Sequence, residues 1–148
     1  MIEIVRASPA HVGVIANRMR QIDRDECAAF GHSPKTALRN GLRASTEAWT
    51  AKVDGVPACM FGLVPVSILE GEATPWFLGS DETYRHPRDM IVTGEALVSY
   101  WLESWRHLSN YVAVENVKAI RLLERWGFSI GEEREFGGAA FVRFEAKA

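Results

Sequence analysis

The sequence predicts an α/β (α+β) fold, in which a mixed, mostly antiparallel central sheet has helices on both faces. Runs of β-type residues lie on both sides of Asp54-Gly55 in the middle of the chain, and this dipeptide is a strong hairpin signal. The second half of the chain then runs strand, helix, strand, helix. Antiparallel hairpins followed by alternating strands and helices favour a sheet of mixed direction.

Length and composition indicate one ordinary globular unit. The chain has 148 residues, of which 47% are hydrophobic, so we expect a single domain over 1–148. The formal net charge of -2 provides no general attraction to nucleic acid. No apolar run reaches the roughly 18 residues of a membrane-spanning helix, and no secretory signal opens the chain. The sequence therefore predicts a cytoplasmic protein that binds neither nucleic acid nor membrane.

The amino-terminal part predicts a strand and two helices. Residues 2–7 form a short strand. Ser8-Pro9 and Ser33-Pro34 each place a capping serine before a proline at the first helical position. The first helix is expected to reach Ile22, and the polar run 23–32 is expected to be an irregular connection.

The rest of the chain predicts six more strands and two more helices. The expected elements are a hairpin within 47–68, a strand at 73–80, a helix at 90–108, a strand at 109–114, a helix after Asn116, and two strands around Gly137-Gly138. The four His and two Cys residues show no metal-ligand spacing, so no metal site is predicted.

The helix after Asn116 has recognisable ends. Asn116 is a good N-cap, Gly127 suits a left-handed C′ position, and Phe128 can fold back on Leu123. The residues Asn116, Ala119, Leu123, Gly127 and Phe128 also resemble the signature that follows the fifth strand in the GNAT acyltransferase superfamily. The predicted order of elements is similar to the GNAT order along the whole chain.

A second resemblance concerns residues 75–90 and 109–128. Trp76-Phe77, Asn110-Tyr111-Val112 and the helix after Asn116 are similar to features of small internal-virion or morphogenesis proteins of short-tailed phages, a GNAT-like group. This resemblance implies an origin in a phage or prophage.

The GNAT resemblance implies a binding site for acetyl-CoA as cosubstrate. In that superfamily the fourth and fifth strands diverge, and the pantetheine arm enters the gap beside the fourth strand. Strands 74–80 and 109–114 are therefore expected to be parallel and to diverge. The backbone of Phe77, Leu78 and Gly79 would bind the arm, and the Asn116 amide would reach the arm or thioester. The alternative for Asn116 is a capping role only.

The loop that binds pyrophosphate in the superfamily is altered here. It corresponds to residues 84–90, where only Arg85 matches the glycine-rich pattern and Pro87 lacks an N–H donor. Two alternatives follow: the side chains of Arg85, His86 and Arg88 bind the phosphates, or the site has decayed.

The catalytic residues implied by the resemblance are incomplete. Leu123 stands where many GNAT enzymes have a tyrosine that protonates the departing thiolate. Glu72, at the start of the fourth strand, is the candidate general base, with Asp81 and Glu82 in the following loop. The alternative for each of these acids is an ordinary solvated turn carboxylate.

Two functions are consistent with these patterns. The first is an acetyl-CoA-dependent N-acetyltransferase with a degenerate pyrophosphate loop, acting on an amine or a protein acceptor. The second is a non-catalytic GNAT-like phage protein that contacts phage structural proteins in virion assembly or acts on the host. The first predicts a protein of the host cytoplasm, and the second one that is associated with the virion.

Overall fold

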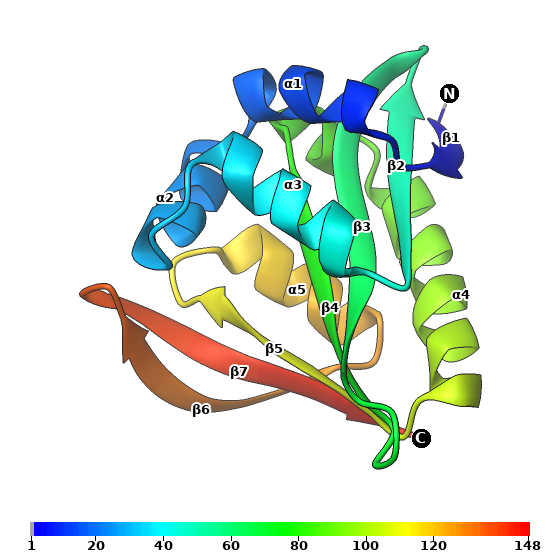
Figure 1. The fold of residues 1–148 in the computed structure, drawn as a ribbon, viewed down its shortest axis with the longest axis vertical. Helices are drawn as coiled ribbons and strands as arrows, with labels where there is room; N and C mark the ends of the chain where they lie inside the picture. Colours follow the sequence, from blue (N-terminus) through cyan, green and yellow to red (C-terminus); the bar gives the residue numbers. More distant parts are fainter. Residues whose placement is uncertain (1) are drawn as a thin grey trace.

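One mixed sheet organises the computed structural model, which describes residues 2–148 (Figure 1). Its seven strands are β1 (Ile2–Arg6), β2 (Glu47–Val53), β3 (Val56–Ser67), β4 (Glu72–Gly79), β5 (His107–Ala113), β6 (Ser129–Phe136) and β7 (Ala139–Lys147), in the order β1-β2-β3-β4-β5-β7-β6. All neighbouring pairs are antiparallel except β4 and β5, which are parallel. The predicted sheet is confirmed.

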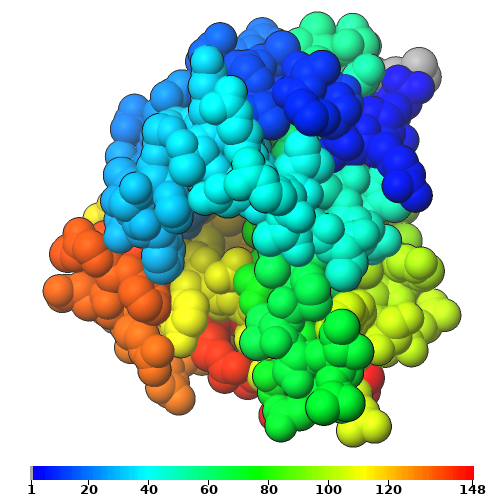
Figure 2. Space-filling model, in the orientation of Figure 1, coloured from blue at the N-terminus to red at the C-terminus, as the bar shows by residue number. Residues whose placement is uncertain are grey.

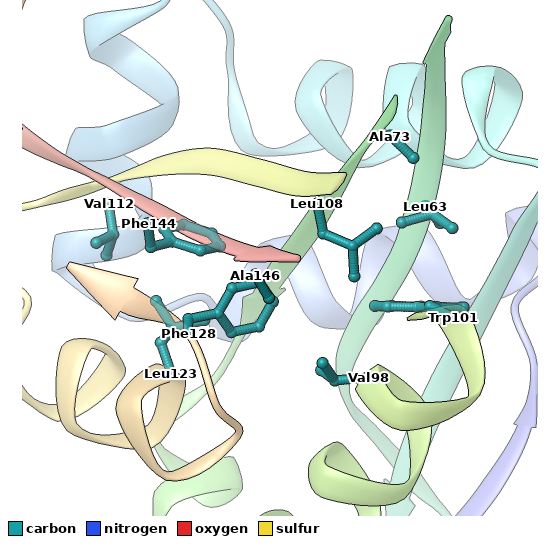
Figure 3. Close-up of a cluster of buried hydrophobic side chains, with 10 residues drawn as sticks. All are labelled: Leu63, Ala73, Val98, Trp101, Leu108, Val112, Leu123, Phe128, Phe144 and Ala146. Carbon is teal, nitrogen blue, oxygen red and sulfur yellow. The ribbon is translucent and has the colours of Figure 1, made fainter. Parts of the chain in front are cut away.

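Helices cover both faces of this sheet. The helices are α1 (Pro9–Arg18), α2 (Gln21–Ala29), α3 (Pro34–Ala44), α4 (Pro87–Ser104) and α5 (Val117–Arg125), and a short 3₁₀ helix, η1 (Asp81–Arg85), precedes α4. On one face, α1, α2 and α3 bury Ile15, Cys27 and Leu38 against Met60 of β3. On the other face, α4 and α5 pack on the sheet through the ten buried side chains of Figure 3, among which Leu123 lies beside Phe128. Two hydrophobic layers thus enclose the sheet.

The largest error of the sequence prediction concerns α2. Residues 23–32 were expected to be irregular, but most of them lie in this helix, whose buried residues are Asp23 and Cys27. Two residues four apart share a helix face, so this pair follows helical periodicity although one member is an acid. The first helix ends at Arg18, before the expected Ile22, because Met19 and Arg20 have extended backbone angles. Helix α4 also starts and ends earlier than its predicted range of 90–108.

The predicted turns are confirmed by backbone angles. Asp54 and Gly55 both have positive φ, at 50° and 82°, as a two-residue hairpin turn requires. Gly127 has φ of 101°, and the Phe128 N–H donates to the Leu123 carbonyl at 3.0 Å. The latter contact closes α5 in the expected way.

The feature that positions a site is the divergence of β4 and β5. They are paired only at Glu72 with His107 and at Ala73 with Leu108, after which the two strands part (Figure 1). The expectation of parallel, diverging strands is confirmed. None of the helices within residues 2–148 is long and apolar enough to cross a membrane.

Candidate active site between the diverging strands

Asn110 bridges β4 and β5 just beyond their last paired residues. Its Nδ2 donates to the carbonyl of Pro75 on β4 at 2.8 Å, and its Oδ1 accepts from the N–H of Tyr111 at 2.7 Å. The Asn110 side chain thus binds a carbonyl of β4 and an N–H of β5, which do not bond to each other. Asn110 marks the closed end of the gap.

Phe77 presents the open backbone edge of β4. Residues 73–79 of β4 pair with β3 without a bulge, so N–H and C=O groups of alternate residues point to the same side. Pro75 and Gly79 direct their carbonyls away from β3, toward Asn110 and the Arg20 N–H respectively. Phe77 lies between them in the same phase, and its N–H and C=O face the gap. No group within residues 2–148 pairs with them.

Two carboxylates of α2 occupy the open end of the gap, one on each strand. Asp23 Oδ2 accepts from the N–H of Gly79 on β4 at 2.9 Å. Glu26 Oε2 accepts from the N–H of Ala113 on β5 at 2.7 Å and from Asn116 Nδ2 at 3.3 Å. Because the two acids are three residues apart, one helical turn places both over the gap.

Arg20 compensates part of this negative charge. Its guanidinium is buried, with Nη1 donating to Asp23 Oδ1 and Nη2 donating to Asn116 Oδ1, both at 3.2 Å. Its Cζ also lies 4.3 Å from the centroid of the Tyr84 ring. Together with the bonds to Gly79 and Glu26, these contacts use both oxygens of Asp23 and both polar atoms of the Asn116 amide.

The environment shifts the pKa of both acids. Burial raises the pKa of Asp23 to about 7, against the hydrogen bond from Gly79, which lowers it. Burial also raises the pKa of Glu26, against the hydrogen bonds from Ala113 and Asn116. The Oε1 atom of Glu26 has no hydrogen-bond partner within residues 2–148. Of the two acids, Glu26 therefore has the oxygen that is free to take a proton from a ligand.

A cavity of about 390 Å³ fills the space between these polar ends. In Figure 2 it is seen as a hollow bounded by α2, α3, the green β4 and the yellow β5. Apolar side chains form most of its wall, including Trp76, Leu123 and Phe144. On the α4 and α5 side, Trp126 packs near Phe77 with ring centroids 6.0 Å apart, and its indole N–H donates to the Met90 carbonyl at 3.0 Å.

The structure brings together only some of the predicted site residues. Phe77, Leu78 and Asn116 line the cavity, and Gly79 lies at the edge of the gap. Asn116 holds the N-cap position of α5, but its side chain makes no capping hydrogen bond, because both ends of its amide bind Arg20 and Glu26 instead. The expected side-chain cap is therefore wrong.

The residues predicted to bind phosphate lie outside the cavity wall. Arg85 Nη1 contacts Glu82 Oε2 at 2.5 Å, and His86 Nε2 lies 3.6 Å from Glu82 Oε1. Arg88 is exposed in the first turn of α4. All three stand at the amino-terminal end of that helix, where the dipole attracts anions, although Pro87 removes one N–H donor.

Glu72, the predicted general base, lies at the opposite end of the gap from α2. It pairs with His107 in the short parallel ladder and is not part of the cavity wall. Asp81 lies 3.7 Å from the Arg20 guanidinium and is otherwise exposed.

Sequence reasoning missed Arg20, Asp23 and Glu26. The available signal was the spacing of Asp23, Glu26 and Cys27, which share one helical face. No group of three metal-ligating side chains occurs within residues 2–148.

Comparisons with known proteins support the fold. No protein-family model and no curated protein sequence matches this chain. Among solved structures, a GNAT-family acetyltransferase from Bacillus anthracis aligns with a TM-score of 0.72 at 8% identity, over 99% of this chain and 94% of the other. Spermidine N-acetyltransferase from Vibrio cholerae, in complex with CoA and spermine, aligns at 0.71 and 14%, over 99% and 95%. The ribosomal-protein-S18-alanine N-acetyltransferase from Escherichia coli aligns at 0.71 and 18%, over 99% and 94%.

These identities are too low to transfer a reaction or a substrate, but the alignments cover nearly the whole chain. The protein has the fold of the GNAT acetyltransferases.

Proposed function

We propose that the protein is an N-acyltransferase that moves an acetyl group from acetyl-CoA to an amine. The observation that carries this proposal is the unpaired backbone edge of Phe77, which faces an apolar cavity between two parted parallel strands. Such an edge can accept one more extended chain with amide groups. Spermidine N-acetyltransferase from Vibrio cholerae, which has the same fold, holds CoA and spermine in its structure.

The donor fits the gap through its two amides. The carbonyl of one pantetheine amide would accept from the Phe77 N–H and the N–H of the other would donate to the Phe77 C=O. The thioester would then lie against the apolar wall that includes Leu123. The phosphates would lie outside the cavity near Arg85, His86 and Arg88, at the start of α4. Binding there requires Arg85 and His86 to exchange Glu82 for phosphate, which is a stronger partner for an arginine.

Glu26 is the proposed base. The amine nitrogen attacks the thioester carbonyl carbon, the C–S bond breaks, and the CoA thiolate leaves. Glu26 Oε1 takes the proton that the amine loses, while Oε2 remains bound to Ala113. The geometry favours Glu26 over Glu72, because Glu72 lies outside the cavity wall. Leu123 has no proton to give, so the thiolate leaves without a side-chain acid from α5. Positioning then provides most of the acceleration.

The proposal is tested by release of CoA thiol from acetyl-CoA in the presence of an amine panel. We expect amine-dependent release by the full chain. Replacement of Arg85 and Arg88 by Ala should raise the KM for acetyl-CoA by roughly tenfold or more and reduce its salt dependence, because exposed charge contacts are screened by ions. Absence of both turnover and heat of acetyl-CoA binding would contradict the proposal.

One observation favours a second candidate. Glu82 already holds Arg85 and His86, and α5 offers Leu123 in place of an acid. A GNAT-like phage or prophage protein that has lost catalysis, serving virion assembly or acting on the host, would also have these features. It would be associated with the virion, whereas the enzyme would act in the host cytoplasm. A gene neighbourhood of phage structural genes, together with no acetyl-CoA binding, would favour this candidate.

A further inference from the structure

The mouth of the cavity carries an aromatic cluster that the acyl donor does not use. Phe30 follows α2, Tyr111 lies on β5 and Phe141 on β7, and all three line the cavity. Phe136 of β6 joins them: its ring centroid is 5.0 Å from those of Phe30 and Tyr111 and 5.6 Å from that of Phe141. The Phe30 and Phe141 rings are 5.3 Å apart at a steep angle. Despite these contacts, 47% of Phe30 remains exposed.

One uncompensated carboxylate lies next to this cluster. Asp23 and Glu26 are the two acidic residues of the cavity wall within residues 2–148. Both oxygens of Asp23 are already bound, by Arg20 and by the Gly79 N–H. Glu26 keeps Oε1 free and is anchored on Ala113, two residues beyond Tyr111 on β5. That spacing is about 7 Å along a strand, a distance that a two- or three-carbon linker can span.

We propose that the acceptor is an arylalkyl primary monoamine, whose ammonium group binds Glu26 and whose ring lies against Phe30 and Tyr111. This inference rests on the proposed function in one respect, which is that the bound amine receives an acyl group from the donor. The carboxylate fixes the amine nitrogen at the inner end of the aromatic cluster, close to the gap. The exposed face of Phe30 provides the apolar surface that the ring of the ligand covers.

The same geometry disfavours polyamines. A second or third ammonium group needs its own carboxylate, since an unpaired charge on an apolar wall is costly. The other ionisable side chains of the wall are His32, Cys27 and two tyrosines, and none of them is a carboxylate. Selectivity for one ammonium and one ring follows from this single free carboxylate and the aromatic wall.

The test is calorimetric titration of the full chain with phenethylamine, spermidine and 2-phenylethanol, without acyl-CoA. We expect phenethylamine to bind at least about tenfold tighter than either of the others, because only it satisfies both the carboxylate and the aromatic wall. Glu26→Gln should weaken phenethylamine binding by about tenfold or more, since it keeps an acceptor for the Ala113 N–H but removes the charge. Phe30→Ala should weaken it by about tenfold.

Asp25→Asn is the matched control on the same helix. Asp25 is exposed and bonds to Gln21 at 2.8 Å, so phenethylamine affinity should not change. Thermal melts of each variant verify that it is folded, and Phe30→Leu provides a second variant that keeps apolar volume without an aromatic ring.

The outcomes separate the two proposals. Tighter binding of spermidine, no binding of phenethylamine, or unchanged affinity in folded Glu26→Gln would overturn the acceptor assignment. Tight phenethylamine binding without acetyl transfer would overturn the acyltransferase function alone. Transfer to spermidine in preference to phenethylamine would overturn the acceptor assignment alone.

Discussion

Glu26 is the residue on which the proposed chemistry depends. Its carboxylate is held by Ala113 and Asn116 through one oxygen, and its other oxygen has no hydrogen-bond partner within residues 2–148. Burial raises its pKa, which brings a carboxylate closer to the range in which a base operates. The polar cluster of Arg20, Asp23 and Asn116 fixes this arrangement.

Replacement of this base should be the most damaging conservative change. Glu26→Gln should lower kcat for amine acetylation by about 100-fold or more, the usual contribution of general base catalysis, whereas Glu72→Gln should have little effect. Steady-state rates of both variants measure the difference. The activity of the wild type should also rise with pH through the raised pKa of Glu26, because the base must be ionised. A larger loss in Glu72→Gln than in Glu26→Gln would contradict the assignment.

Asp23 should link stability to pH. Burial raises its pKa from the ordinary 3.8 of an aspartate to about 7 in the fold, so the native state binds more protons than the unfolded chain between these values. The resulting stabilisation is fully present below the unfolded pKa and is lost as pH rises through the folded pKa. Asp23→Asn is neutral at every pH and keeps an oxygen for the Gly79 N–H. The stability of this variant should therefore depend less on pH than that of the wild type between about pH 5 and pH 8.

Urea unfolding between about pH 5 and pH 8 measures this linkage. The free energy of unfolding of the wild type should fall more steeply with rising pH than that of Asp23→Asn. Parallel slopes for the two proteins would show that Asp23 titrates at its ordinary pKa.

Individual site residues were only partly predictable from the sequence. Phe77 and Asn116 were identified through a resemblance, and both line the cavity. The bonding of Asn116 was not predictable, because its partners Arg20 and Glu26 lie 96 and 90 residues away in the chain. The Asn116 side chain suits a helix cap by propensity, but it binds Arg20 and Glu26 instead. Rules that use only neighbouring residues cannot predict such contacts.

At the level of elements, α2 determines how the gap is closed. Asp23 and Glu26 of this helix bind the N–H groups of Gly79 on β4 and Ala113 on β5, which would otherwise face the gap between the strands. The sequence of this helix is polar enough to resemble a connection, because one of its inward positions is an acid. Hydrophobic periodicity therefore failed here, whereas it located the apolar helices α1, α3, α4 and α5 within a few residues.

The packing of α4 against α5 depends on one glycine. A Cβ on Gly94 would lie 1.9 Å from the indole of Trp126, whose N–H is bound to the Met90 carbonyl. Gly94→Ala should therefore destabilise the fold by about 1–3 kcal/mol through overpacking. Gly13→Ala is the matched control, since this α1 glycine has nothing within 4 Å of its added Cβ. It should be stabilising by about 0.5–1 kcal/mol.

Urea unfolding of the two alanine variants provides the comparison. Equal stability of Gly94→Ala and the wild type would mean that Trp126 moves freely away from α4. The indole would then not be a fixed wall of the gap.

For the whole molecule, the mixed sheet was predictable from the sequence, but the side chains that form the cavity were not. Strand and helix patterns, together with the turns at Asp54-Gly55 and Gly137-Gly138, predicted a mixed sheet of six or seven strands, and the structure has seven. The cavity depends on where two strands part and on side chains from both faces. That information lies in contacts between distant segments.

The central claim is that the backbone edge of Phe77 binds the pantetheine arm of acetyl-CoA. The direct measurement is a titration of the isotope-labelled protein with acetyl-CoA, in which the backbone amide resonances are followed by nuclear magnetic resonance. We predict a large shift and slower hydrogen exchange for the Phe77 amide, with smaller changes at Gly79 and Ala113, whose N–H groups are already bound by carboxylates. No change at any residue of the gap, or binding that leaves Phe77 unchanged while distant amides shift, would contradict the account.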